Sequence, residues 1–239
     1  MISVAIPAHN ESKYILPCLK TLTKQDTTEN FEVVVCLNNC TDDTEQVIND
    51  FASNNKINIR TVVEERKGVT FARDTATRAC EGEIILNTDA DSEPFTNWLS
   101  EARKSFEKNP KAISAYGPIE FPKEAKWWQK WLAKYGYTWF LRITHLFGVY
   151  NFGGFNFVVK REAYLKVDGL NLELKTAEDV DLAMRLKKIG KVVFNAKMKV
   201  YTSHRRLENN PGQFFAHHIK NFWRVVILKK EALPMKDIR

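Results

Sequence analysis

The chain has 239 residues, 44% of them hydrophobic and 27% charged, and its formal net charge is +7. This composition is ordinary for a globular protein and excludes disordered, collagen-like and disulfide-scaffold proteins. Residues 1–196 hold 26 basic and 26 acidic side chains, whereas the remaining 43 residues hold ten and three. The positive excess therefore belongs entirely to the C-terminal part of the chain, where it indicates a partner surface.

The cysteine spacing and the hydropathy together predict the cellular compartment of the protein. Cys18, Cys36, Cys40 and Cys80 lack paired CxxC spacing, so we expect free thiols in a reducing compartment. The first residues do not have the pattern of a signal peptide, and no window holds about 18 consecutive apolar residues. The sequence thus predicts a cytoplasmic protein without a membrane-spanning helix.

Strands and helices alternate through the first ninety residues, as in βαβ units of a mostly parallel sheet. Strands are expected at 2–7, 31–37, 57–63 and 83–87, and helices at 12–24, 42–52 and 68–80. Four strands joined by three crossovers predict a doubly wound α/β fold.

The second half is less regular. Helices are expected at 97–108, 177–189 and 212–230, and strands at 112–117, 155–159 and 192–200. Because no Pro-, Gly- or Ser-rich linker interrupts the chain, we expect one domain over residues 1–206. The basic segment 207–239 is expected to be a helical extension that packs on, or extends, this domain.

An acidic pair, Asp89 and Asp91, follows the fourth strand directly. Ligands of open α/β sheets bind at the carboxyl ends of the strands, and alternate residues of an extended segment point the same way. The two carboxylates are therefore candidates to hold a hard cation through oxygen ligands. Capping of a turn is the alternative interpretation.

A second acidic cluster opens the helix expected at 177–189. Glu178, Asp179 and Asp181 lie in its first turn, where the helix dipole alone would favour carboxylates. Asp179 is the candidate general base, because Ala183 and Leu186 follow it at helical spacing and indicate an inward-facing edge.

Two further motifs are candidates for ligand contact. The turn Gly153-Gly154 lies among aromatic residues and would permit close backbone approach to a substrate, although a plain tight turn explains it equally well. The cations in Ser203-His204-Arg205-Arg206 could meet phosphate oxygens, and a solvated loop is the alternative.

Together these motifs resemble the family 2 glycosyltransferases with the GT-A fold, over roughly residues 1–206. The motifs VAIPAHNE, NNCTDDT, KGVTFARDTA, TDADS, GGFNF and AEDVDL occur in the order and approximate spacing of that family. The resemblance implies transfer of a sugar from a nucleotide diphosphate to an acceptor hydroxyl, with Mg²⁺ or Mn²⁺ and inversion at the anomeric carbon. It implies a UDP- or GDP-sugar donor.

The resemblance also implies roles for individual residues. Asp179 corresponds to the catalytic base, and Asp91 to a metal ligand, with His204 beside it and Glu93 as a further metal contact. The acceptor side would include Gly154, Asn156 and Glu178. The donor side would comprise Pro7, Asn10, Glu11, Asn38, Gly68, Arg73, Asp89, Asp91, Arg205 and Arg206.

Two other function classes compete with this interpretation. A nucleotidyltransferase of similar fold typically needs a Gly-rich, Lys-containing phosphate loop, and PAHNESKY near the start is not one. A non-catalytic basic binding protein would use the C-terminal segment, but the balanced charge elsewhere speaks against nucleic acid as the partner.

The aromatic stretch 127–150 and the C-terminal segment suggest surfaces outside the catalytic layer. The stretch holds nine aromatic residues, with Lys126, Lys130, Lys134 and Arg142 between them. Core packing, an acceptor platform and a membrane surface all stay open for it. The basic C-terminal segment is expected to adsorb to an anionic membrane, which would make the protein peripheral at the inner face.

Overall fold

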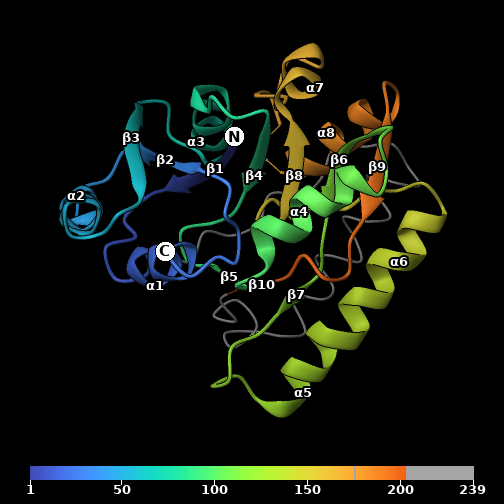
Figure 1. Cartoon of the computed structure of the whole chain (residues 1–239), viewed down its shortest axis with the longest axis horizontal. Helices are drawn as coiled ribbons and strands as arrows, with labels where there is room; N and C mark the ends of the chain where they lie inside the picture. Colours follow the sequence, from blue (N-terminus) through green and yellow to red (C-terminus); the bar gives the residue numbers. More distant parts are fainter. Residues whose placement is uncertain (175, 203–239) are drawn as a thin grey trace.

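The computed structural model describes residues 1–174 and 176–202. Its centre is a seven-stranded sheet of order β3-β2-β1-β4-β8-β6-β9, and β5, β10 and β7 form a second, three-stranded sheet (Figure 1). The central strands are β1 (Ile2–Ala8), β2 (Phe31–Asn38), β3 (Asn58–Glu64), β4 (Ile84–Asn87), β6 (Ala112–Tyr116), β8 (Phe157–Lys160) and β9 (Lys191–Phe194). The small sheet comprises β5 (Glu93–Pro94), β7 (Ile119–Glu120) and β10 (Val200–Tyr201).

Helices cover both faces of the central sheet. One hydrophobic cluster joins the sheet to α1 (Ile15–Leu22), α2 (Thr44–Asn54) and α4 (Trp98–Glu107). The other joins it to α3 (Val69–Ala79), α6 (Thr138–Leu146), α7 (Arg161–Lys166) and α8 (Glu178–Lys187). The remaining helical segments are α5 (Trp127–Trp131) and a π-helical stretch, η1 (Leu132–Tyr137). The predicted doubly wound, mostly parallel α/β architecture is confirmed.

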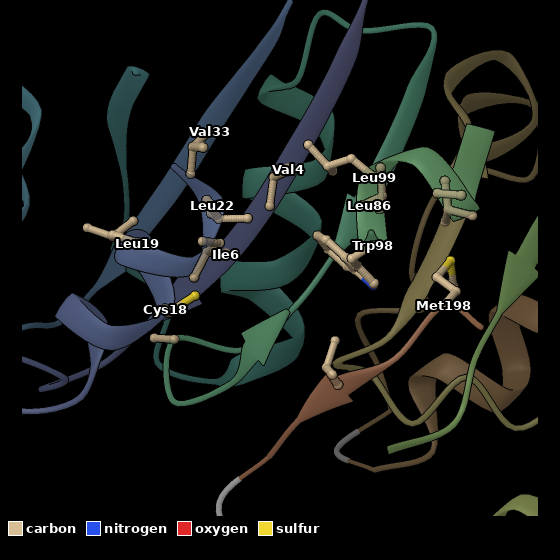
Figure 2. Close-up of a cluster of buried hydrophobic side chains, with 14 of the residues drawn as sticks. Val4, Ile6, Cys18, Leu19, Leu22, Val33, Leu86, Trp98, Leu99 and Met198 are labelled. Carbon is tan, nitrogen blue, oxygen red and sulfur yellow. The ribbon is translucent and has the colours of Figure 1, made fainter. Parts of the chain in front are cut away.

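The apolar pattern explains this layering. In α1, the buried residues Ile15, Cys18, Leu19 and Leu22 recur at helical spacing and form one stripe against the sheet. Figure 2 shows this stripe facing Val4, Ile6 and Val33 of the central strands, with Trp98 of α4 on the same side. The strands β1 and β2 read as continuous apolar runs because both of their faces are covered.

Pro7 lies in a central strand, where its missing N–H would normally break a ladder. The pairing of β1 with β4 ends at Ala5 and Asn87, whereas the pairing with β2 continues through Pro7. Thr88 donates its backbone N–H to the Ala5 carbonyl, 3.2 Å away, and β4 ends there. Strands β1 and β4 therefore separate before Pro7, while β1 and β2 stay paired. This leaves space between β1 and β4 at the carboxyl end of the sheet.

The predicted strands agree with the structure to within one residue at each end, with two exceptions. The strand expected at 192–200 is two strands, β9 and β10, because Asn195 forms a turn in which its Oδ1 accepts the backbone N–H of Lys197 at 2.9 Å. The strand expected at 155–159 begins only at Phe157, because the Phe155 N–H donates to the Gly153 carbonyl in a tight turn. The domain boundary expected at residue 206 and the helix expected at 212–230 lie outside the described residues.

Within residues 1–174 and 176–202, none of the helices has the length and apolar content needed to cross a membrane.

Candidate active site

The loops that follow β1 and β2 are tied together at the carboxyl edge of the sheet. Asn10 adopts a left-handed conformation, with φ of 54°, and its side-chain Oδ1 accepts the backbone N–H of Thr41 at 2.8 Å. The backbone N–H of Glu11 donates to the hydroxyl of Thr44 at 2.8 Å. These contacts bring the predicted donor residues Asn10 and Glu11 beside the loop after β2.

Asn38 organises the next loop along the same edge. Its side-chain Nδ2 donates to the carbonyls of Glu64 and Arg66, and its Oδ1 accepts the backbone N–H of Gly68 at 2.9 Å. The structure therefore brings Asn38 and Gly68, two residues predicted on the donor side, into direct contact. Because Asn38 is buried and its amide is used internally, it shapes this loop from within.

The acidic pair lies at the end of β4, beside α1. The Cys18 thiol donates to the Asp89 carbonyl, with sulfur and oxygen 3.8 Å apart. Burial raises the pKa of the Cys18 thiol, and the nearby charges of Asp91, Glu93 and Asp89 raise it further. The charges of these three carboxylates therefore all act on the buried Cys18 thiol, and this corner of the site is negatively charged.

Arg73 of α3 is the central cation of the site and is only 3% exposed. Its Nη2 donates to the Asp89 carboxylate at 2.8 Å, and its Nη1 donates to the Glu178 carboxylate at 2.7 Å. Burial acts to lower the pKa of the guanidinium, but Asp89, Glu178 and Asp179 together raise it. Arg73 therefore joins the end of β4 to the start of α8 and stays charged.

Glu178 and Asp179 both turn inward at the start of α8. The inward edge expected from Ala183 and Leu186 is confirmed, since both are fully buried and Asp179 is 9% exposed. Burial raises the pKa of both carboxyls, and the charge of Arg73 partly offsets this rise. Asp179 is therefore a stronger base than a carboxylate in water.

The backbone before α8 is strained. Ala177, which immediately precedes Glu178, has a left-handed conformation with φ of 60°. Such residues cost about 1–3 kcal/mol and cluster at functional sites. The left-handed Ala177 is the residue at which the chain turns into α8, directly before the two buried carboxylates.

The Gly153-Gly154 turn packs directly on this charged centre. Both glycines have left-handed conformations, with φ of 69° and 66°, and a Cβ at Gly154 would lie 3.1 to 3.3 Å from the guanidinium of Arg73. A hydrogen bond from the Gly153 backbone acts to lower the pKa of Asp179. The backbone of this turn, which was predicted to approach a substrate, therefore lies against Arg73 and Asp179 of the protein.

Tyr137 completes this side of the site, and the sequence motifs did not single it out. Its hydroxyl would lie 3.2 Å from a Cβ on Gly153. Burial and the nearby charge of Asp179 raise the pKa of that hydroxyl. Helical spacing from buried Ala133 and Leu141 is the signal that could have identified it.

Asn156, predicted on the acceptor side, is enclosed by the protein itself. It has no exposed surface, and its Nδ2 donates to the carbonyls of Pro118 and Met198. Its Oδ1 accepts the indole N–H of Trp98 at 2.8 Å. With the whole amide used internally, Asn156 is a structural residue that joins β8 to α4 and to the segments before β7 and β10. The amide predicted to face the acceptor is thus occupied within the protein.

The residues that could hold a cation are fewer than the sequence suggested. His204, Arg205 and Arg206 lie outside the described residues. Among the residues that are described, no three His, Cys, Asp or Glu side chains come together as a metal site. Mg²⁺, however, is commonly bound through one or two carboxylates together with substrate phosphates. Asp91, together with Asp89, could supply the one or two carboxylates of such a site.

Comparison with known proteins gives the family. The model of Glycosyl transferase family 2 matches residues 3–167. Chondroitin synthase of Escherichia coli is 24% identical over 250 residues, and the alignment covers 100% of this chain and 35% of that protein. The chain therefore spans about a third of the length of this curated relative.

Solved structures agree on the fold. A mannosyltransferase from Pyrobaculum calidifontis, in complex with GDP-Man and Mn²⁺, has a TM-score of 0.73 at 22% identity, covering 97% of this chain and 65% of that chain. Residues 1–349 of TarS from S. aureus, in complex with UDP, have a TM-score of 0.67 at 22% identity, covering 84% and 60%. The sheet is that of the GT-A glycosyltransferases, and the chain belongs to Glycosyl transferase family 2.

Proposed function

We propose that this chain is an inverting, metal-dependent glycosyltransferase that moves a sugar from a nucleotide diphosphate to an acceptor hydroxyl. The observation that carries the proposal is the convergence of Asp89 and Glu178 on buried Arg73, beside the inward-facing Asp179. The solved neighbours that contain GDP-Man or UDP support a UDP- or GDP-sugar as donor.

Asp179 would accept the proton of the incoming hydroxyl as its oxygen attacks the anomeric carbon. A buried carboxylate of raised pKa suits this task, because general-base efficiency increases as the pKa approaches the working pH. Attack from the face opposite the diphosphate inverts the anomeric configuration in one displacement. Glu178, held by Arg73, would border the acceptor together with Gly154.

The donor would lie along the loops after β1, β2 and β4. Asn10, Glu11 and Gly68 belong to these loops or to the start of α3, and Pro7 opens the sheet edge beneath them. Asp91, with Asp89 beside it, would hold Mg²⁺ or Mn²⁺. When bound, the cation would neutralise charge on the diphosphate. The proposed contributions of His204, Arg205 and Arg206 fall outside the described residues.

Thermal unfolding with nucleotides tests the donor proposal. The full chain would be heated with UDP or GDP, each with Mn²⁺ and with a chelator, and with Mn²⁺ alone as the control. We expect one nucleotide to raise Tm only when the cation is present, because binding to the folded state alone stabilises it. If neither UDP nor GDP raises Tm under any of these conditions, the donor proposal is wrong.

A donor screen then tests transfer itself. Release of nucleotide diphosphate from UDP- and GDP-sugars would be measured with and without added hydroxyl acceptors. Release that depends on both the donor and the cation supports the proposal. Pyrophosphate release from nucleoside triphosphates would instead support a nucleotidyltransferase.

A further inference from the structure

The helix formed by α5, η1 and α6 presents its bulky apolar side chains outward. Residues 127–146 form one continuous helix along an edge of the molecule (Figure 1). Trp127, Trp131 and Trp139 are 77%, 58% and 60% exposed. The other large exposed apolar residues of this segment are Tyr135, Ile143, Leu146 and Phe147. This exposed row, 127/131/135/139/143/147, is called the aromatic stripe below.

The opposite side of the same helix packs on the domain. Gln129, Ala133, Leu141 and Thr144 are buried against the domain, and Tyr137 is half-buried. Amphipathic helices of globular proteins bury their larger apolar residues. Packing on the domain therefore accounts for this side of the helix but not for the aromatic stripe, whose tryptophans are exposed and do not belong to the core.

The π-helical stretch keeps the stripe in line. A spacing of four residues advances a side chain by about 40° beyond one turn of an α-helix, so a long row at that spacing would wind around the helix. A π-helical turn contains more residues than an α-helical turn and reverses this drift. Because η1 covers residues 132–137 in the middle of the row, Trp127, Trp131, Tyr135 and Trp139 stay on one face.

A basic row runs beside the stripe. Lys126, Lys130, Lys134 and Arg142 each precede a member of the stripe by one residue, and residues 125–161 contain no Asp or Glu. Lys126, Lys134 and Arg142 are exposed. A cavity of about 280 Å³ opens next to this row, lined in part by Lys134, Arg142 and Lys199, with Glu120 paired to Lys199. The charge complements an anionic surface.

We infer that the helix of residues 127–146 lies in the interface of an anionic lipid bilayer, with the aromatic stripe at the boundary between head groups and acyl chains. Tryptophan and tyrosine favour that depth, because one part of each ring system is apolar and another is polar. Lys126, Lys130, Lys134 and Arg142 lie where they reach lipid phosphates. This inference rests on the exposed helix and does not depend on the proposed sugar transfer.

The orientation has a consequence for the active site. Tyr137 lies on the domain side of the same helix, next to Asp179. A helix with its side chains is about 10–12 Å across. The catalytic centre would therefore stand roughly one helix diameter above the bilayer, where it could meet an acceptor held at the membrane surface.

Flotation of the full chain with vesicles tests the inference. At low salt, we expect the protein to float with equimolar phosphatidylcholine and phosphatidylglycerol but not with phosphatidylcholine alone. W131S/W139S should lower the partition coefficient by at least about tenfold, through loss of apolar burial. The control V63S removes an exposed apolar side chain from β3, at the far end of the sheet, and should leave partitioning unchanged.

The basic row is tested in the same assay. K130Q/K134Q/R142Q should weaken partitioning by roughly a hundredfold, since each basic residue near an anionic surface contributes about 1 kcal/mol, or about fivefold. K20Q/K24Q/K108Q removes the same charge from exposed positions elsewhere and should have a much smaller effect.

Several outcomes would overturn the inference. If W131S/W139S floats as well as the unmodified protein, residues 203–239 are the attachment. If the chain binds no vesicles but forms a dimer that W131S/W139S abolishes, a second copy covers the stripe. Should W131S/W139S fail to fold, quenching of tryptophan fluorescence by brominated lipid in W223F decides, because unquenched fluorescence contradicts insertion of the stripe.

Discussion

At the residue scale, the described part of the site is an acidic cluster in which the buried Arg73 pairs with two of the carboxylates. Arg73 contacts Asp89 and Glu178, and its charge also acts on Asp179. Without that cation, three carboxylates at short range would protonate or repel one another. The guanidinium therefore keeps two carboxylates in defined positions and partly offsets the rise in the pKa of the buried Asp179.

Substitution of the two key acids should separate binding from transfer. Asp91→Asn should remove cation-dependent donor binding, whereas Asp179→Asn should keep the donor bound and lower kcat by at least about a hundredfold, since general-base catalysis contributes 10²–10⁴-fold. Nucleotide-induced shifts in Tm and rates of diphosphate release distinguish the two effects. Asp181→Asn, on the same helix and paired with Arg185, is the control. Near-normal turnover of Asp179→Asn would contradict the assignment.

The pH dependence of kcat/KM should show the raised pKa of Asp179. Activity requires the ionised carboxylate, so the rate should fall as pH decreases through its pKa. Because burial raises that pKa above the usual 3.8, the acid limb should lie above the range of an exposed Asp.

The raised pKa of Asp179 also means that the folded state gains stability as pH falls through this pKa. Asp179→Asn should therefore be at least as stable as the unmodified protein near neutral pH, as urea unfolding would reveal.

Removal of the Tyr137 hydroxyl should affect the acceptor side selectively. Because this hydroxyl lies near Gly153 and Asp179, Tyr137→Phe should lower kcat/KM for the acceptor by roughly 3- to 10-fold, as for loss of one hydrogen-bonding group. KM for the donor should not change. Tyr135→Phe removes an exposed hydroxyl two residues earlier and is the control. Equal effects of the two variants on the acceptor would count against a site role for Tyr137.

At the element scale, irregular segments border the charged residues that α3 and α8 supply. The turn at Gly153-Gly154 and the strained residue Ala177 both lie directly beside the buried charges. The π-helical stretch η1 ends at Tyr137. Each of these features departs from ideal geometry at the point where a side chain or a backbone amide has to be directed toward Asp179.

Substitution of Gly154 by alanine tests whether the Gly153-Gly154 turn has to lie against Arg73. Gly154→Ala would place a Cβ 3.1 to 3.3 Å from the Arg73 guanidinium and force a left-handed conformation on alanine. The conformation alone costs about 1–2 kcal/mol. We expect a lower urea midpoint together with reduced transfer, because Arg73 must shift. Gly148→Ala, whose φ is 73° and whose Cβ would meet the flexible Lys187 side chain, should lose stability but keep activity.

At the scale of the whole molecule, the site joins the two halves of the fold. Arg73 belongs to α3 in the first half, whereas Glu178 and the Gly153-Gly154 turn belong to the second. The sheet itself changes direction nearby, since β8 pairs antiparallel with both β4 and β6. Folding of both halves is therefore required before the charged centre exists.

Loss of Arg73 should destabilise the whole domain. Arg73→Met leaves Glu178 and Asp89 without their buried partner, and breaking such a pair costs about 3–5 kcal/mol. The free energy of unfolding in urea measures this loss. Arg103→Met, which breaks more exposed pairs with Glu29 and Glu83, should cost about 1 kcal/mol or less. Similar losses in both variants would show that the Arg73 centre is not the link between the halves.

Much of the first half was predictable because its signals are local. A near-continuous apolar run predicted β2, helical spacing predicted α1, and the inward edge of α8 followed from Ala183 and Leu186. The aromatic stretch was less predictable. Its larger apolar residues face outward, so periodicity alone could not decide which side of the helix is buried.

The sequence by itself determined the α/β fold, the family and the acids at the ends of β4 and the start of α8, since strand periodicity and short motifs are carried by neighbouring residues. Only the tertiary structure decided which side chains serve that site. It buried Asn156 among Trp98, Pro118 and Met198, and it brought Arg73 and Tyr137 to Gly154, Gly153 and Asp179. Contacts between residues distant in the chain depend on how the helices and loops pack on the sheet, and the local sequence pattern does not determine this packing.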